Sequence, residues 1–384
     1  MRQLLQFLEG SGRSAELVTP HGWARGRAAT LRRLALVPLF APRVVLERVW
    51  GPAHVWWYRT SHELVLRRAL RQRLAGLGRC TVYAQCPLAA RAALEARSGP
   101  HQRVVLAVHF RRSQADEWAD KGQIARDRLV FRSIRTAERE VIPQVDGVVF
   151  VSEWSRNVLR EWLPEVDAVP AVVIPNFIDA PPAGGRSKGQ VDLVTVGSLE
   201  PVKNHRFLLH VLAAATKAGR AYSLDVFGEG PDATELEALA QELGLARQVR
   251  FRGFRGDVQQ RLPSYRAYVH ASYSESLPLS IIEAMAAGLP VLAADAGGVR
   301  ELFDDGVEGR LWPLDDPEVA ARILVELLDD PAALDAAGRD ARLRFVRAFA
   351  SESVAPRLLR FLDGDATRSD ALERDAPGDA VATG

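Results

Sequence analysis

The second half of the chain alternates short apolar runs with helix-like segments, and this alternation restricts its fold more than any other feature. Apolar runs at 191–196, 223–227, 249–252, 267–270 and 291–294 each lead into a turn, and segments with helical periodicity lie between them. This alternation predicts a doubly wound parallel sheet whose crossovers are helices. In such sheets ligands lie beyond the carboxyl ends of the strands, where the loops here contain Gly197, Gly228, Gly253, Tyr273 and Gly297.

The segment Ser274–Asp295 combines two carboxylates with a helix start. Glu275 lies in a predicted loop, Pro278 occupies the expected first helical position, and Glu283 follows on the helix itself. The free N–H groups and positive dipole end of such a helix suit a phosphate or diphosphate. Carboxylates beside it can accept hydrogen bonds from sugar hydroxyls, so the segment indicates a nucleotide-sugar site. The alternative is an amphipathic helix whose glutamates face solvent.

Three glycine-containing turns accompany this segment. The first, VGSLEPVKNH, places Lys203 near a predicted helix start, where a cation is unfavourable for the helix dipole. That position favours a functional lysine over a solvated surface lysine. The other turns are FGEGP at 227–231 and FRGFRGDV at 251–258. The GEG turn lacks the glycine spacing of a dinucleotide-binding motif, so no dinucleotide is predicted there.

Together these motifs resemble the donor-binding half of the GT4 family of retaining glycosyltransferases, which have the GT-B fold. Glu275 and Glu283 are similar to the family's E-x7-E pair, and the loop at Gly197 is similar to its diphosphate loop. The resemblance implies that Glu283 binds the nucleotide ribose, that Glu275 contacts the donor sugar and its leaving phosphate, and that Lys203 offsets the diphosphate charge. Many members have Arg after the glycine, where this chain has Ser198. The implied donor-binding residues are Gly197, Ser198, Lys203, Gly228, Phe254, Glu275, Ser276, Leu277, Leu279 and Glu283.

The same resemblance brings a histidine of the first half into the site. His109 follows the apolar run RVVLAV, where the family has a histidine facing the donor sugar, and it is implied to be catalytic with Lys203 and Glu275. The alternative is a buried histidine satisfied by the backbone. A loop on the acceptor side is expected to contain Arg111, Gln114, Asp116 and Glu117. Asn176 is expected to fix a turn rather than to touch substrate.

With 384 residues, of which 47% are apolar and 26% charged, the chain fits two soluble globular domains. The expected fold class is α/β, with two Rossmann-like parallel-sheet domains facing a central cleft, the GT-B architecture. We expect an acceptor-binding domain at 1–180, a linker at 181–190 and a donor-binding domain at 191–345. The linker sequence PPAGGRSKGQ lacks the spacing of a phosphate-binding P-loop. A helix at 346–363 is expected to cross back to the first domain, and 364–384 to be a disordered tail.

The opening residues depart from the family pattern. MRQLLQFLEGSGRSAELVTP is typical of a helix followed by a strand, whereas GT4 proteins begin with a strand and a Gly-rich loop that contacts the donor phosphates. The first strand is therefore expected to be missing. This favours either a misassigned start or a protein that binds its ligands but is impaired in catalysis.

The first hundred residues are strongly basic. They contain 16 arginines and no lysine against 5 glutamates and no aspartate, a net charge of about +11. No zinc-finger spacing or RNA-binding aromatic signature accompanies the arginines, so nucleic acid is not an expected partner. The segment Leu31–Trp50 and the nearby Trp56 and Trp57 mix arginine with apolar and aromatic residues. Two interpretations stay open: contact with anionic lipid headgroups, or ordinary helices with solvated arginines.

Several other chemistries lack their motifs. The chain has no HExxH zinc motif, no GxSxG elbow, no Cys/His cluster and no suitably placed DxD motif, so neither a metal nor another cofactor is expected. Cys80 and Cys86 form no disulfide pattern, and the chain has neither a signal peptide nor a membrane-spanning run, so a cytoplasmic location is expected.

The combined prediction is a retaining, metal-independent glycosyltransferase. It would move a sugar from a UDP- or GDP-sugar to a hydroxyl of a glycan or lipid-linked acceptor, in polysaccharide or glycoconjugate biosynthesis. Two alternatives remain: a nucleotide-sugar epimerase of the same fold, or the catalytically impaired binding protein. The absence of aspartate from the first hundred residues argues against the epimerase, which needs acid and base carboxylates there.

Overall fold

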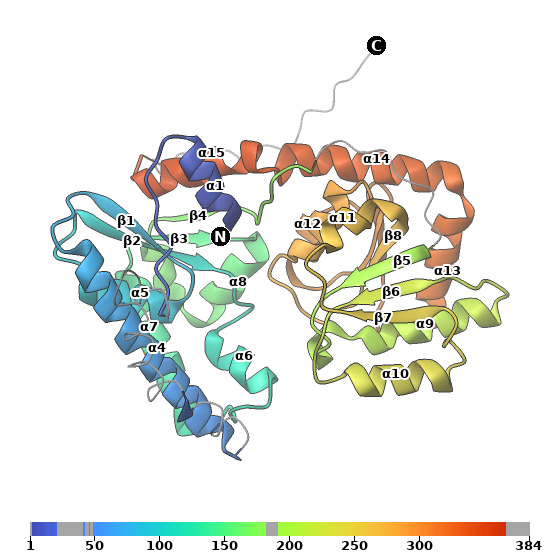
Figure 1. The fold of residues 1–384 in the computed structure, drawn as a ribbon, viewed down its shortest axis with the longest axis horizontal. Coiled ribbons are helices and arrows are strands. Elements are labelled where there is room, and N and C mark those ends of the chain that lie inside the picture. The colour runs from blue at the N-terminus through green and yellow to red at the C-terminus, as the bar shows by residue number, and fades with distance from the viewer. Residues whose placement is uncertain (1, 21–40, 43–45, 47–48, 182–190, 366–384) are drawn as a thin grey trace, which may run out of the picture. The chain divides into compact units, whose positions relative to one another are not determined.

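The computed structural model describes residues 2–20, 41–42, 46, 49–181 and 191–365, which divide into two compact units. Unit 1 comprises the chain up to Ile174 and again from Pro356 on, and unit 2 runs from Pro175 to Ala355. Each unit is built around a parallel sheet, as predicted (Figure 1). The expected linker and tail lie outside the described residues, at 182–190 and 366–384, as does most of the segment Leu31–Trp50.

Unit 1 has a four-stranded sheet in the order β1-β2-β3-β4. Its strands are β1 (Cys80–Ala84), β2 (Gln102–Val108), β3 (Gly147–Phe150) and β4 (Ala171–Val173). Its helices include α1 (Arg2–Gly10), α4 (Gly51–Leu74), α5 (Pro87–Ala96), α6 (Gln114–Asp120), α7 (Leu129–Val141) and α8 (Glu153–Trp162). The residues of β2 from Val104 onward are at most 1% exposed. This burial explains their continuous apolar sequence, because a parallel strand covered on both faces does not alternate.

Two features at the start of unit 1 differ from the sequence-based expectations. β1 was not predicted, because CTVYA is short and only partly buried at the edge of the sheet, where it pairs with β2 alone. The strand expected after α1 does not form in the described residues. Side chains hold that segment instead, since Val18 packs against the core of unit 1 and Glu16 pairs with Arg73 at 2.9 Å.

Unit 2 has a six-stranded sheet in the order β10-β9-β8-β5-β6-β7. Its strands are β5 (Val191–Val196), β6 (Leu224–Phe227), β7 (Val249–Gly253), β8 (Tyr265–His270), β9 (Val291–Ala294) and β10 (Gly309–Trp312). Its helices include α9 (His205–Lys217), α10 (Ala233–Glu242), α11 (Val258–Arg261), α12 (Leu279–Ala286), α13 (Pro317–Asp329) and α14 (Pro331–Ala348). Successive strands run outward from β5 to β7, and the chain then returns to β8 and runs the other way. The doubly wound sheet predicted for this half is confirmed, although β10 and α14 were not predicted.

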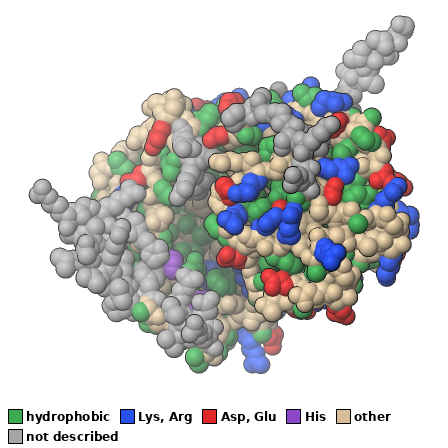
Figure 2. Space-filling view, turned by 45° about the vertical axis from the view of Figure 1, so that its right-hand side comes forward, with side chains coloured by type: hydrophobic (Ala, Val, Ile, Leu, Met, Phe, Trp, Pro, Cys, Tyr) green, Lys and Arg blue, Asp and Glu red, His purple; other side chains and the backbone are tan. Residues whose placement is uncertain are grey.

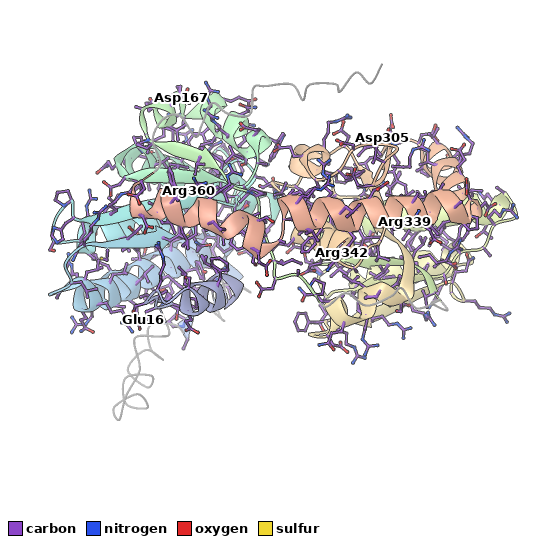
Figure 3. The ribbon with its side chains drawn as sticks, turned by 90° about the horizontal axis from the view of Figure 1, so that it is seen from above. Glu16, Asp167, Asp305, Arg339, Arg342 and Arg360 are labelled. Carbon is purple, nitrogen blue, oxygen red and sulfur yellow. The ribbon has the colours of Figure 1, made fainter. Side chains whose placement is uncertain are left out.

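Helices cover both faces of this sheet, with α9 and α10 on one side and α11 and α12 on the other (Figure 1). On α12, Ile281, Ile282 and Met285 are completely buried. The carboxyl end of α12 is held by Arg342 of α14 (labelled in Figure 3). The Arg342 guanidinium donates to the main-chain oxygens of Ala286 and Pro181. A cation at that end also suits the helix dipole. The helix that carries Glu283 is therefore fixed along its buried face and at its end.

Helix α15 (Ser351–Asp363) is divided between the two units, its residues from Pro356 on belonging to unit 1. At its start, the Ser351 hydroxyl donates to Asp179 at 2.6 Å within unit 2. At its end, the Arg103 guanidinium donates to the main-chain oxygen of Leu362 at 2.9 Å within unit 1. Hydrogen bonds therefore anchor both ends of the helix, each within its own unit.

Gly228, directly after β6, allows two strand-end loops to approach closely. Its φ is +144°, and a Cβ there would lie 1.8 Å from the main-chain oxygen of Gly197.

We expect Gly228→Ala to lower the free energy of unfolding by at least about 2 kcal/mol, because the backbone must shift. Urea unfolding would measure the change. Gly256→Ala is the control, since no atom lies within 4 Å of its Cβ position; an equal midpoint for both variants would contradict the prediction.

Candidate functional site

The reversal of strand order in unit 2 falls between β5 and β8, which lie side by side. At such a switch point the loops leave the two strands in opposite directions and open a crevice that commonly holds ligands. Here the loop after β5 carries Gly197, Ser198 and Lys203, and the loop after β8 carries Glu275 and Ser276. The topology therefore brings together two segments that are about seventy residues apart in the chain.

An ion pair joins these two loops. The Lys203 Nζ lies 2.5 Å from the Glu275 Oε1, with side-chain exposures of 27% and 12%. Lys203 ends a short 3-10 turn, and Asn204 follows with a φ of 51°, which redirects the chain into α9. On the other loop, the Gly298 N–H donates to the main-chain oxygen of Glu275 at 2.8 Å. Both partners of the pair are thus held by their backbones.

The Glu275 carboxylate has a second basic neighbour. His270, the last residue of β8, places its Nε2 3.4 Å from the same Oε1 and 3.1 Å from the Ser272 hydroxyl. Burial by itself raises the pKa of Glu275, but the hydrogen bond from His270 and the charge of Lys203 outweigh it and lower the pKa to about 2. Glu275 is therefore a carboxylate throughout the physiological pH range.

The start of α12 leaves free backbone donors beside this pair. Pro278 is the N-cap rather than the first helical residue, so the expected position was wrong by one residue. Pro278 makes no side-chain cap hydrogen bond, and the N–H groups of the first turn, beginning at Leu279, have no acceptor within the helix. Leu279 is 47% exposed, whereas Ser276 and Leu277 are buried. The Asn176 amide donates to the Leu277 main-chain oxygen at 2.8 Å, so it joins the segment after β4 to the loop before α12, and its expected role in fixing a turn stays a prediction.

The remaining predicted donor residues lie on the same edge of the unit 2 sheet. Glu283, on α12, accepts a hydrogen bond from Gln259 of α11 at 2.6 Å, and burial raises the pKa of its carboxyl. A Cβ at Gly197 would have no atom nearer than 3.9 Å, so the space beside this glycine is open. Phe254, after β7, is 74% exposed, and Ser198 lies directly after Gly197. The arrangement supplies carboxylates for hydroxyls and a lysine with free amides for an anion.

Two histidines near the ion pair were missed by the sequence reasoning, namely His205 and His270. Burial is the largest cause that lowers the pKa of His205 to about 4, so this imidazole is neutral at pH 7. The position of His270 in the sequence could have identified it as a candidate site residue. His270 is the last residue of a buried strand, and His109 directly follows one in the first half, but His270 carries no family motif.

The acceptor-side residues of unit 1 are not in a loop, which corrects the sequence-based expectation. Gln114, Asp116 and Glu117 lie in helix α6, because the Ser113 side chain accepts from the Asp116 N–H and caps the helix. Arg111 precedes this helix and pairs with Asp120 at 3.0 Å. Each member of the group is thus engaged within unit 1 itself.

Inside unit 1 these side chains meet a buried carboxyl that was not predicted. Glu138 of α7 is completely buried, accepts from the Gln114 main-chain N–H at 2.8 Å, and has its pKa raised to about 7 by burial. Asp116 accepts from Arg135 of α7 at 2.8 Å. The contacts tie α6 to α7, so Gln114 and Asp116 have evident structural roles.

His109 lies directly after β2 with an exposed side chain, although the surrounding protein lowers the pKa of its imidazole through burial. Its Nε2 lies 3.2 Å from the Oε1 of Gln85, in the loop after β1. His109 belongs to unit 1, whereas the donor residues belong to unit 2, and its contact with a donor sugar stays a prediction. Among the residues whose placement is described, no three His, Cys, Asp or Glu side chains are grouped as metal ligands.

Family models match both halves of the chain. Residues 1–180 match the model described as Glycosyltransferase Family 4, and residues 177–344 match that described as Glycosyl transferases group 1. The chain belongs to the GT4 family of glycosyltransferases. The two matches meet near the boundary between the units at Pro175.

Glycosyltransferases of several kinds are among the curated relatives of the GT4 chain. It is 28% identical to a 2-deoxystreptamine glucosyltransferase of Streptomyces kanamyceticus, over 54% of this chain and 57% of that protein. It is 33% identical to a D-inositol 3-phosphate glycosyltransferase of Streptomyces avermitilis, over 53% of this chain and 49% of that protein. The matches thus span about half the length of these relatives.

Solved structures show the same fold. Anabaena HepE in complex with UDP and glucose has a TM-score of 0.64 and 21% identity, over 77% of this chain and 80% of that chain. Sucrose-phosphate synthase from Thermosynechococcus elongatus has a TM-score of 0.65 and 22% identity, over 79% of each chain. The GT-B fold class predicted from the sequence is confirmed.

The lowered pKa of Glu275 makes its contribution to stability depend on pH. A carboxyl whose folded pKa of about 2 lies below the ordinary 4.5 stabilises the fold fully above the ordinary value, and this contribution is lost as the pH falls towards 2. We therefore expect Glu275→Gln to lower the free energy of unfolding at neutral pH by about 3 kcal/mol, and the difference from wild type to shrink in acid.

Urea unfolding at a series of pH values would measure this difference. Glu326→Gln is a suitable control, because Glu326 is 66% exposed and its nearest cation is 3.9 Å away. A difference between Glu275→Gln and wild type that stays constant from neutral pH to about pH 3 would contradict the expected linkage.

Proposed function

We propose that this GT4 protein is a retaining glycosyltransferase that needs no metal. It would transfer a sugar from a UDP- or GDP-sugar to a hydroxyl of a glycan or lipid-linked acceptor, in polysaccharide or glycoconjugate biosynthesis. The observation that carries the proposal is the Lys203–Glu275 ion pair beside the uncapped start of α12, with Glu283 farther along that helix. HepE, a solved structure of the same fold, is in complex with UDP and glucose.

In the proposed reaction, Lys203 and the first amides of α12 stabilise the charge that grows on the leaving diphosphate. Such preorganised donors and charges contribute most where charge develops in the transition state. Glu283 accepts hydrogen bonds from the ribose hydroxyls, and Glu275 accepts one from the donor sugar. The acceptor hydroxyl loses its proton largely to the departing phosphate oxygen as its own oxygen forms the new glycosidic bond. The chain's own cation and amides would do what a metal ion does in metal-dependent transferases.

The protein is expected to turn over, or slowly hydrolyse, at least one member of a panel of UDP- and GDP-sugars, with a rate that EDTA does not change. Nucleotide release would be measured with and without candidate acceptors. If no donor releases nucleotide under any of these conditions, the proposed activity is wrong. Inversion at the anomeric carbon, seen by NMR of the product, would contradict the retaining mechanism.

Two variants separate the roles within this assay. Lys203→Ala is expected to lower turnover more than it weakens donor binding, because its charge matters most as the diphosphate departs. Glu283→Ala is expected to weaken nucleoside diphosphate binding by about 1–3 kcal/mol, the range for hydrogen bonds to charged groups. Lys217→Ala, at the far end of α9, is the matched control for removing a lysine. Wild-type values in both site variants would contradict the assigned roles.

We further propose that unit 1 rests on anionic lipid at the inner membrane face and meets a lipid-linked acceptor there. Among the described helices, none combines the length and apolar composition that a bilayer span requires. The support is one face of α4 and the residues just before it, where Val49, Trp50, Trp56 and Leu64 are between 49% and 77% exposed. Arg68 and Arg71 are exposed farther along the same helix. Aromatic side chains beside arginines suit the interface of an anionic bilayer.

The protein is expected to sediment with anionic vesicles, to stay in solution with neutral vesicles, and to dissociate as salt shortens the Debye length below about 10 Å. Trp50→Ala/Trp56→Ala should weaken binding several-fold. Leu343→Ala, 52% exposed on α14, is the control for an apolar surface residue elsewhere. Basic side chains also gather on unit 2 (Figure 2). If the tryptophan variant binds anionic vesicles as tightly as wild type does, another surface, such as these basic side chains, makes the contact. That result would contradict the proposed role of the α4 face.

A further inference from the structure

One oxygen of Glu275 lies beside two basic side chains. Its Oε1 lies 2.5 Å from the Lys203 Nζ and 3.4 Å from the His270 Nε2. The imidazole of His270 is only 5% exposed, and its Nδ1 has no hydrogen-bond partner among the described residues. The His270 main chain is fixed by Trp312, whose indole N–H donates to its carbonyl oxygen at 3.1 Å. His270 is therefore held against the carboxylate, while its Nδ1 makes no hydrogen bond with the described residues.

A diphosphate at Lys203 would compete with Glu275 for the lysine charge. A buried carboxylate that loses its cation is costly, so the site would have to restore a positive charge beside Glu275. Histidine is the side chain whose charge ordinarily changes near neutral pH, and His270 is already in place. Glu275 itself remains the anion, because its pKa is held far below neutrality.

The other groups around His270 determine the direction of this coupling. Lys203 and His205 face it from the loop after β5 and from the start of α9, and Ser272 contributes only a neutral hydroxyl. Glu275 is its anionic neighbour. While Lys203 is paired with Glu275, the lysine charge opposes protonation of His270. Bound phosphate charge would offset that repulsion and add attraction, so anion binding and protonation of His270 would favour each other.

We propose that His270 takes up a proton when a nucleoside diphosphate binds at Lys203, and that it thereby keeps Glu275 compensated and in position. The inference rests on the proposed donor site and deepens it. His270 acts through Glu275 and is a positioning residue. The affinity for the nucleotide should fall as the pH rises, because the proton becomes harder to acquire.

Calorimetry of UDP and GDP binding in buffers with different ionisation enthalpies would measure the protons taken up. At about pH 8 the terminal phosphate is fully ionised and does not contribute. Wild type is expected to take up a substantial fraction of one proton per nucleotide, up to about one, with affinity falling up to about tenfold per pH unit. His270→Gln keeps a side-chain donor for Glu275 but cannot titrate, so its uptake should be close to zero.

Two further histidine variants control the assignment. His101→Gln removes an exposed histidine of unit 1 and should leave the uptake unchanged, and His205→Gln tests the neighbouring imidazole. Circular dichroism would verify that each variant is folded. If His270→Gln does not fold, nitrogen-15 NMR of the wild-type imidazole decides the question. Its pKa should be higher with UDP or GDP than without.

The outcomes separate this inference from the proposed function. Nucleotide binding without proton uptake, or equal uptake in wild type and His270→Gln, overturns the role of His270 and leaves the donor site standing. Uptake lost in His205→Gln but kept in His270→Gln also overturns it, because the proton then belongs to His205. Absence of UDP and GDP binding to wild type contradicts the donor site itself and the inference with it.

Discussion

A buried carboxylate holds the candidate site of unit 2 together. Glu275 joins the loop after β8 to the loop after β5 through Lys203, and its own main-chain oxygen joins it to the turn at Gly298. These loops converge because the strand order of unit 2 reverses between β5 and β8. The reversal brings the carboxyl ends of adjacent strands together while their helices leave on opposite faces. The strand order of unit 2 therefore brings Lys203 and Glu275 close enough to form the ion pair.

The fold of unit 2 could be predicted closely from its residues because its strands are buried on both faces. β5 and β9 have the predicted bounds, since an apolar run between two turns is distinctive when no polar residue interrupts it. β10 was missed for the opposite reason. Gly309–Trp312 has only two buried residues of four and includes Arg310, so its sequence has no continuous apolar run.

Unit 1 was harder to predict because several of its contacts are specific to side chains rather than to periodicity. Helix α6 was expected to be a loop, since the run from Gln114 to Asp120 is mostly polar and short. It is a helix because Ser113 caps it and Glu138 and Arg135, both on α7, hold its first turn. Glu138 itself could not be found from sequence, because nothing in EREV distinguishes a buried carboxyl from a solvated one.

The Lys203–Glu275 pair combines two demands that oppose each other. A lysine held by a carboxylate is preorganised, so little reorganisation is needed when charge develops nearby. The same carboxylate neutralises the lysine charge that a bound anion would need. A tighter Lys203–Glu275 pair therefore leaves less positive charge to attract the anion. A second partner for Glu275 relieves this conflict, because the carboxylate can release part of its hold on the lysine without being left unpaired in a buried position. His270 lies where such a partner must be, against the same carboxylate oxygen as Lys203.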